Sequence, residues 1–122
     1  MLNVPPSTKI FVCSRAIDMR LSFDALSGLV QSHMGQNPLS GYLYIFFSRR
    51  RDRMKLLFWD IDGFVLYYKR LEEGTFGWMS DTISGENPEI TSTDLALLLA
   101  GINPMQVKRQ KRFVRKPEPS LV

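Results

Sequence analysis

The sequence predicts an α+β fold, because three strand-length apolar runs follow one another through short connections and amphipathic helical segments flank them. These runs are rich in aromatic and branched side chains and comprise Tyr42–Phe47, Met54–Trp59 and Phe64–Leu71. Their connections, 48–53 and 60–63, are too short for parallel neighbours, which need about a dozen or more linking residues. We therefore expect an antiparallel meander of three to four strands plus a first strand, with two amphipathic helices packed on it and a basic C-terminal tail.

The remaining strands are expected on either side of the meander. Lys9–Cys13 is short, branched and aromatic, and is typical of a first strand. Thr75–Trp78 follows a Glu-Glu-Gly turn and could supply the fourth strand of the meander. Residues 79–90 are polar, contain a glycine and a proline, and are expected to form a loop.

Two segments carry helical signals. Over residues 23–34, apolar side chains recur with a helical period, Ser22 offers an N-cap hydroxyl, and Gly35 is placed to end the helix. The second helix begins at a Thr-Ser-Thr-Asp capping box over residues 91–94. Its apolar stripe comprises Leu95, Leu98, Leu99 and Ile102, and Gly101 and Pro104 are expected to stop it.

The strand alternation also predicts which side chains enter the core. Successive residues of a strand point to opposite faces, so Leu57 and Trp59 share one face and Phe58 lies on the other. We expect Trp59 to face inward with Leu57, packed against Phe23 and Leu26 of the first helix.

Charge divides the chain into two parts. Residues 1–104 carry 10 cations and 11 acids, a balance of −1, and are expected to form a single domain with an irregular arm at 1–8. Residues 105–122 carry 6 cations and 1 acid, a balance of +5. Such a basic tail favours an anionic partner such as nucleic acid or a membrane surface, although solubility or localisation alone would also explain it. Its cations are Lys108, Arg109, Lys111, Arg112, Arg115 and Lys116.

Composition and catalytic motifs argue against several protein classes. The sequence has no apolar run near the roughly 20 residues of a membrane span and no secretory signal, and its single cysteine suits a reducing cytoplasm. His33, at a helix end, is interpreted as a capping or surface residue, and Cys13 as a buried structural thiol. Zinc spacing, a P-loop and a dinucleotide fingerprint are missing. We expect no enzymatic activity, no cofactor and no metal.

The acids leave one alternative open. Asp60 and Asp62 could converge on a magnesium ion, with Asp18 as a third ligand, as in metal-dependent nucleases. The same Asp-x-Asp-Gly pattern is ordinary turn chemistry, with Gly63 expected to supply a positive φ. We favour the turn.

The connection between the first two meander strands is dense in cations. Five of the eight residues from position 48 to 55, which cover this connection and the start of the next strand, are basic, and arginine offers a planar fork that matches phosphate oxygens. A nucleic-acid contact surface is the preferred interpretation, and a charged, soluble edge hairpin is the alternative. The candidate phosphate contacts are Arg49, Arg50, Arg51, Arg53 and Lys55, together with the six cations of the tail.

Two longer stretches resemble the signatures of a known family. Residues 16–30 (AIDMRLSFDALSGLV) are similar to T-D-M-R-K-S-F-D-G-L, and residues 50–72 (RRDRMKLLFWDIDGFVLYYKRLE) to R-G-D-R-L-K-I-L-Y-W-D-G-D-G-F-V-L-W-Y-K-R-L-E. Residues 93–102 resemble its closing helix. The family is the TnpB, or second-reading-frame, accessory protein of the insertion-sequence-sixty-six family of bacterial transposable elements. This resemblance covers roughly residues 9–103.

The resemblance implies an accessory role in transposition without catalytic residues, because a separate, larger protein carries the transposase activity. It implies binding to DNA at the transposon ends, to the transposase, or to both, in the cytoplasm at the nucleoid. An adaptor that docks on the transposase without contacting DNA is the alternative. The chain departs from the signature at Leu21, Arg51 and Ile61, where lysine, glycine and glycine are usual. Motif residues without an assigned role are Asp18, Arg20, Asp52, Asp60, Asp62, Gly63, Lys69 and Arg70.

Overall fold

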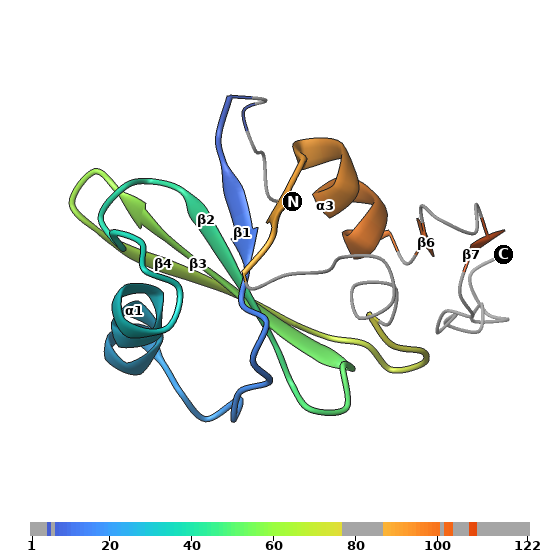
Figure 1. Cartoon of the computed structure of the whole chain (residues 1–122). Helices are drawn as coiled ribbons and strands as arrows, with labels where there is room; N and C mark the ends of the chain where they lie inside the picture. The colour runs from blue at the N-terminus through green and yellow to red at the C-terminus, as the bar shows by residue number, and fades with distance from the viewer. Residues whose placement is uncertain (1–4, 6, 77–86, 101, 104–107, 110–122) are drawn as a thin grey trace, which may run out of the picture.

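The computed structural model describes residue 5 and residues 7–76, 87–100, 102–103 and 108–109 of the chain. Its centre is a five-stranded mixed sheet with the strand order β4-β3-β2-β1-β5, which separates helix α1 from helix α3 (Figure 1). The strands of this sheet are β1 (Ile10–Val12), β2 (Leu43–Phe47), β3 (Arg53–Asp60), β4 (Gly63–Arg70) and β5 (Glu89–Ile90), and the helices are α1 (Phe23–Ser32) and α3 (Ser92–Leu99). The predicted α+β class is confirmed.

Strands β2, β3 and β4 follow one another as antiparallel neighbours. Their register pairs Tyr44 with Leu57 between β2 and β3, and Leu57 with Leu66 between β3 and β4. The strand limits differ from the predicted ones by a residue at most ends, since hydrogen bonding extends β3 to Arg53 and Asp60.

The first strand pairs in parallel with β2, which places it inside the sheet. Ile10 lies opposite Leu43 and Val12 opposite Ile45. Between these two strands the chain crosses over through α1, and a connection of this length permits parallel pairing. On its other side, β1 pairs antiparallel with β5.

Strand β5 corrects the prediction of a loop over residues 79–90, because Glu89 and Ile90 pair with β1. A two-residue strand shows no measurable alternation, so its long-range pairing leaves no sequence signal. Conversely, Thr75 and Phe76 form no strand, and the rest of the predicted Thr75–Trp78 strand lies outside the described residues.

A separate two-stranded sheet follows α3. It pairs β6 (Ile102–Asn103) with β7 (Lys108–Arg109) in antiparallel register. The predicted helical stripe was therefore wrong at Ile102, because α3 ends at Leu99. Of the six tail cations, Lys108 and Arg109 lie in β7, and the other four lie outside the described residues.

Each face of the five-stranded sheet has its own core. On one face, α3 and Phe76 cover Ile45, Phe47 and Leu56. On the other face, Leu26 and Val30 of α1 pack with Tyr44, Phe46 and Leu57. All five side chains of β2 are buried, because this central strand is covered on both faces.

Trp59 shows where strand alternation alone misleads. Leu57 is fully buried against the α1 core, as predicted, but Trp59 is only half-buried and packs edge-on against Phe64, with ring centroids 5.1 Å apart. Phe23, predicted to cover it, is 42% exposed. Trp59 is the next-to-last residue of β3 and belongs to neither core.

The helix ends match the sequence signals in most respects. Thr91 and Asp94 form both hydrogen bonds of the capping box that begins α3. Ser22 is the N-cap of α1, but its hydroxyl makes no capping hydrogen bond. Gly35 adopts a positive φ of 64° after α1, which a glycine allows without strain. Among the described residues, no helix combines the length and the apolar character required to cross a bilayer.

Candidate functional site

The connection between β2 and β3 is a tightly bonded turn that fixes two exposed arginines. Backbone hydrogen bonds join Ser48 to Arg53 and Arg51 to Ser48, each 3.0 Å long. The Ser48 hydroxyl also donates to the Asp52 carboxylate at 3.2 Å. A turn closed at both ends presents the intervening side chains of Arg49 and Arg50 to solvent from a rigid backbone.

Beside this turn the surface forms a hollow of about 490 Å³, which we call the arginine hollow. Its walls come from four segments, namely the turn after β1, the β2–β3 turn, the first residue of β3 and the edge strand β4. The hollow is lined by Asp18, Met19, Arg20, Ser48, Arg49, Arg50, Asp52, Arg53 and Tyr68. Four arginines against two aspartates leave a balance of 4 − 2 = +2, so the hollow is cationic.

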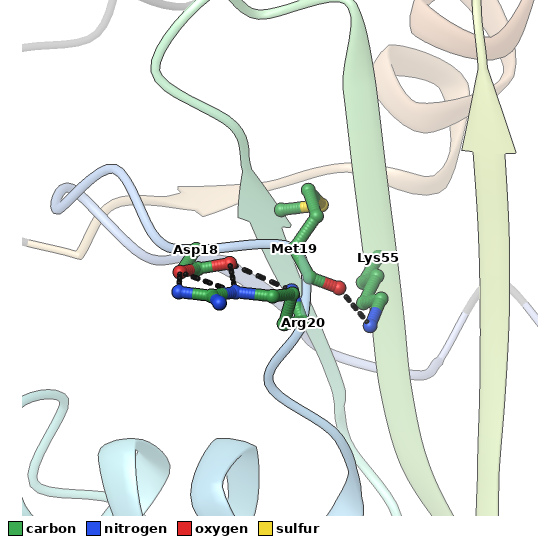
Figure 2. A network of polar contacts seen from close by, with 4 residues as sticks. All are labelled: Asp18, Met19, Arg20 and Lys55. Atoms are coloured by element: carbon green, nitrogen blue, oxygen red, sulfur yellow. Dashed lines mark hydrogen bonds and ion pairs between the residues drawn. The ribbon is translucent and has the colours of Figure 1, made fainter.

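The Asp18–Arg20 pair forms one edge of the hollow (Figure 2). The Arg20 guanidinium donates to both Asp18 oxygens at distances of 2.7 to 3.1 Å, and the Arg20 backbone N–H donates to the same carboxylate at 2.9 Å. These hydrogen bonds lower the pKa of Asp18 to about 2, so the carboxylate is ionised at any physiological pH. Asp18 thereby neutralises Arg20, whereas none of the hydrogen bonds or ion pairs of the described residues engages the guanidinium groups of Arg49 and Arg50.

A buried lysine anchors this edge from below. Lys55 is 5% exposed and donates from Nζ to the carbonyl oxygens of Met19 and Leu21, both at 2.6 Å. Figure 2 shows its ammonium beside the turn that carries Asp18 and Arg20, bonded to the Met19 carbonyl. The ammonium also lies 4.9 Å from the centroid of the Tyr68 ring. Lys55 is therefore a positioning residue, and its proposed phosphate contact is corrected: its charge is already bound inside the protein.

Arg51 also lies apart from the arginine hollow. Its guanidinium stacks over the Phe47 ring at 5.1 Å, and Phe47 belongs to the core on the α3 face. Its backbone carbonyl accepts from Phe76 at 2.7 Å, which ties the turn to the segment after β4. Of the predicted hairpin cations, the hollow thus brings together Arg49, Arg50 and Arg53, while Arg51 supports the turn from the other side.

The acids of the possible magnesium site do not converge. Asp60 and Asp62 flank the β3–β4 turn, whereas Asp18 lies beside the β2–β3 turn at the opposite end of β3. Within the part of the chain that the structure describes, no three His, Cys, Asp or Glu side chains gather in a way that could hold a metal ion. The role predicted for Gly63 was also wrong, since the positive φ of this turn belongs to Ile61, at 57°.

The remaining candidate residues have structural partners. Lys69 donates to the Leu99 carbonyl at 2.9 Å and so caps the C-terminus of α3, and Arg70 pairs with Glu72 at 2.9 Å on the surface. Cys13 is buried, and this burial raises the pKa of its thiol. His33 is the C-cap of α1, and its ring lies 3.5 Å from the Ser14 hydroxyl.

Of the residues that line the hollow, Arg20 was known from the sequence only as a motif residue without a role, and Tyr68 was not singled out. Arg20 is about thirty residues from the arginine-rich turn, and only the loop after β1 brings it there. Tyr68 appeared as one aromatic residue among several in β4. The strand register places Tyr68 opposite Lys55. Lys55 lies on the same strand face as buried Leu57, and this pattern was the signal in the sequence that could have indicated a covered site.

Comparisons with known proteins find one family model and two relatives. A family model described as "IS66 Orf2 like protein" matches residues 8–109. The chain is 30% identical over 119 residues to "Uncharacterized protein y4jC" of Sinorhizobium fredii (strain NBRC 101917 / NGR234), across 96% of this chain and 97% of that protein. It is 33% identical over 103 residues to "Uncharacterized protein y4hO" of the same strain, across 84% and 88%. No solved structure matches.

Proposed function

The chain belongs to the IS66 Orf2-like family, and from this premise we propose that it is a non-catalytic accessory protein for the transposition of an insertion sequence, acting by binding DNA. Family membership supports the association with transposition. The contact with DNA rests on the arginine hollow, and specifically on the position of Arg49 and Arg50 at its rim.

Arginine at such a rim suits phosphate recognition for two physical reasons. A guanidinium is always charged at neutral pH and presents paired N–H donors that match two phosphate oxygens at once. Arg49 and Arg50 are exposed and project from a hydrogen-bonded turn, so the backbone is already ordered when a phosphate binds and only side-chain freedom is lost. Arg53 adds a third charge inside the hollow.

The basic tail adds positive charge to this proposed contact with DNA. Its six cations together carry more charge than the hollow, and they are Lys108, Arg109, Lys111, Arg112, Arg115 and Lys116. In this proposal they contact neighbouring phosphates without sequence preference, while the hollow sets the position of the protein on the DNA.

Docking on the transposase is the second candidate function. A smaller, more apolar hollow of about 350 Å³ lies between the loop after β1 and α1, with Ile17, Leu21 and Leu29 in its wall. It adjoins the arginine hollow at Asp18. An adaptor would use this apolar hollow and leave the arginines unused.

A pull-down separates the two functions. The purified protein is tested separately against element-end DNA and against the transposase of the same element. Exchange of Arg49 and Arg50 for serine should weaken the capture of DNA and leave the protein folded, because both side chains are exposed and the tail cations remain. A Lys9→Ser, Arg15→Ser variant removes the same charge outside the arginine hollow and should retain DNA; because Arg15 lines the apolar hollow, this variant is the control for the DNA arm only. Capture of the transposase with no DNA binding at low salt would favour the adaptor.

A further inference from the structure

Tyr68 places an accessible aromatic ring inside the arginine hollow. It lies on the edge strand β4, on the sheet face that carries α1, and its side chain is 48% exposed. Its hydroxyl lies 3.4 Å from Nη1 of Arg53, and the ammonium of Lys55 lies 4.9 Å from its ring centroid. These contacts hold the ring in place, while about half of the surface of the Tyr68 residue stays open to solvent and the residue lines the hollow.

An exposed aromatic ring beside Arg49 and Arg50 suits an unpaired nucleic-acid strand better than a duplex. In a duplex, each base is stacked between its neighbours and presents only its edges, so a protein ring has no base face to contact. In an unpaired strand the base faces are free, and proteins bind them by stacking on aromatic side chains next to a cationic track for the backbone.

The size of the hollow agrees with this assignment. Its volume of about 490 Å³ lies within the range of about 300–1,000 Å³ that is typical of sites for small ligands, and a nucleotide is such a ligand. Arg49 and Arg50 stand at the turn that forms one wall, and Tyr68 comes from the neighbouring strand. A phosphate at the turn and a base on the ring would occupy the same hollow.

We propose that the arginine hollow binds an unpaired nucleotide of a DNA strand, with the backbone phosphate on Arg49 and Arg50 and the base stacked on Tyr68. This inference rests on the proposed DNA-binding function and adds the form of DNA that the hollow selects. Lys55 contributes by holding both the Tyr68 ring and the turn that carries Arg20.

Fluorescence anisotropy at low salt tests this assignment with a labelled single strand and a duplex of the same sequence. Tyr68→Leu should weaken binding of the single strand by about 5- to 100-fold, the contribution of one stacked base, and change duplex binding less than about twofold. Tyr68→Phe keeps the ring and should bind the single strand like the parent protein. Equal losses on both forms of DNA would overturn the assignment while leaving DNA binding in place.

A second measurement needs no variant. A single strand whose central residues are abasic keeps its phosphates and loses its bases, so the unaltered protein should bind it about 5- to 100-fold more weakly than the intact strand. Equal affinity for the two strands would overturn the stacking assignment. Failure of the protein to bind either strand or the duplex would overturn the proposed DNA-binding function itself.

Discussion

Replacing Ile61 with glycine should stabilise the protein. Ile61 occupies the turn between β3 and β4 with a φ of 57°, a conformation that strains any β-branched residue. Its side chain is 90% exposed, so its removal forfeits almost no packing. The related signature has glycine at this position, and the structure gives the physical reason for that preference.

The magnitude follows from two opposing terms. A non-glycine residue in the left-handed region costs about 1–3 kcal/mol, which the exchange recovers. Glycine in turn loses more conformational freedom on folding, which costs about 0.5–1 kcal/mol. The free energy of unfolding should therefore rise by about 1 kcal/mol, equivalent to a Tm increase of about 3–5 °C for a chain of this size.

Urea unfolding followed by tryptophan fluorescence measures the change. Ile61→Ala is the matched control, because alanine removes the same exposed side chain but keeps most of the backbone strain, so it should yield less than half of the gain. Arg51 also has a positive φ, of 59°, but its guanidinium stacks on Phe47, so Arg51→Gly should gain less than Ile61→Gly. A lower unfolding midpoint for Ile61→Gly would refute this reasoning.

Three further predictions concern the arginine hollow and the acids. Lys55→Met should lower the free energy of unfolding by about 2–4 kcal/mol in urea titrations, because the carbonyls of Met19 and Leu21 lose their donor; an unchanged midpoint would contradict the anchoring role. Asp18 has its pKa lowered from 3.8 to about 2 by Arg20, so its contribution to stability is complete above about pH 5 and largely lost as the pH falls to about 2. The difference in Tm between the parent and Asp18→Asn should shrink over that window, and an undiminished difference at pH 2 would exclude this ion pair as its cause. Magnesium should leave Tm unchanged, since the described acids form no cluster, and a saturable rise would revive a metal site.

Much of the sheet could be predicted because its central hairpins are local. Strands β2, β3 and β4 are long enough to show aromatic and branched runs, and their short connections leave antiparallel pairing as the only option. The capping box of α3 was equally local, with Thr91 and Asp94 three residues apart. By contrast, β1 and β5 are two or three residues long and pair across the chain, so no periodicity reports their order in the sheet.

The arginine hollow was predictable only in part for the same reason. Arg49, Arg50 and Arg53 are neighbours in sequence, and their density was visible at once. The turn carrying Asp18 and Arg20 reaches them through the crossover between parallel strands, which depends on tertiary packing. Counting charges also assigned Lys55 to the surface, although its strand face, shared with Leu57, places it in the interior.

The salt dependence of duplex binding tests the central claim most directly. Each phosphate contact releases condensed counterions, so four to six engaged side chains should give a slope of log affinity against log salt of roughly −4 to −5. Removal of Arg49 and Arg50 should flatten this slope by about 1.8, at about 0.9 per contact, whereas removal of Lys9 and Arg15 should leave it unchanged. Equal slopes for the parent protein and the Arg49, Arg50 variant would contradict the arginine hollow as a DNA-binding site.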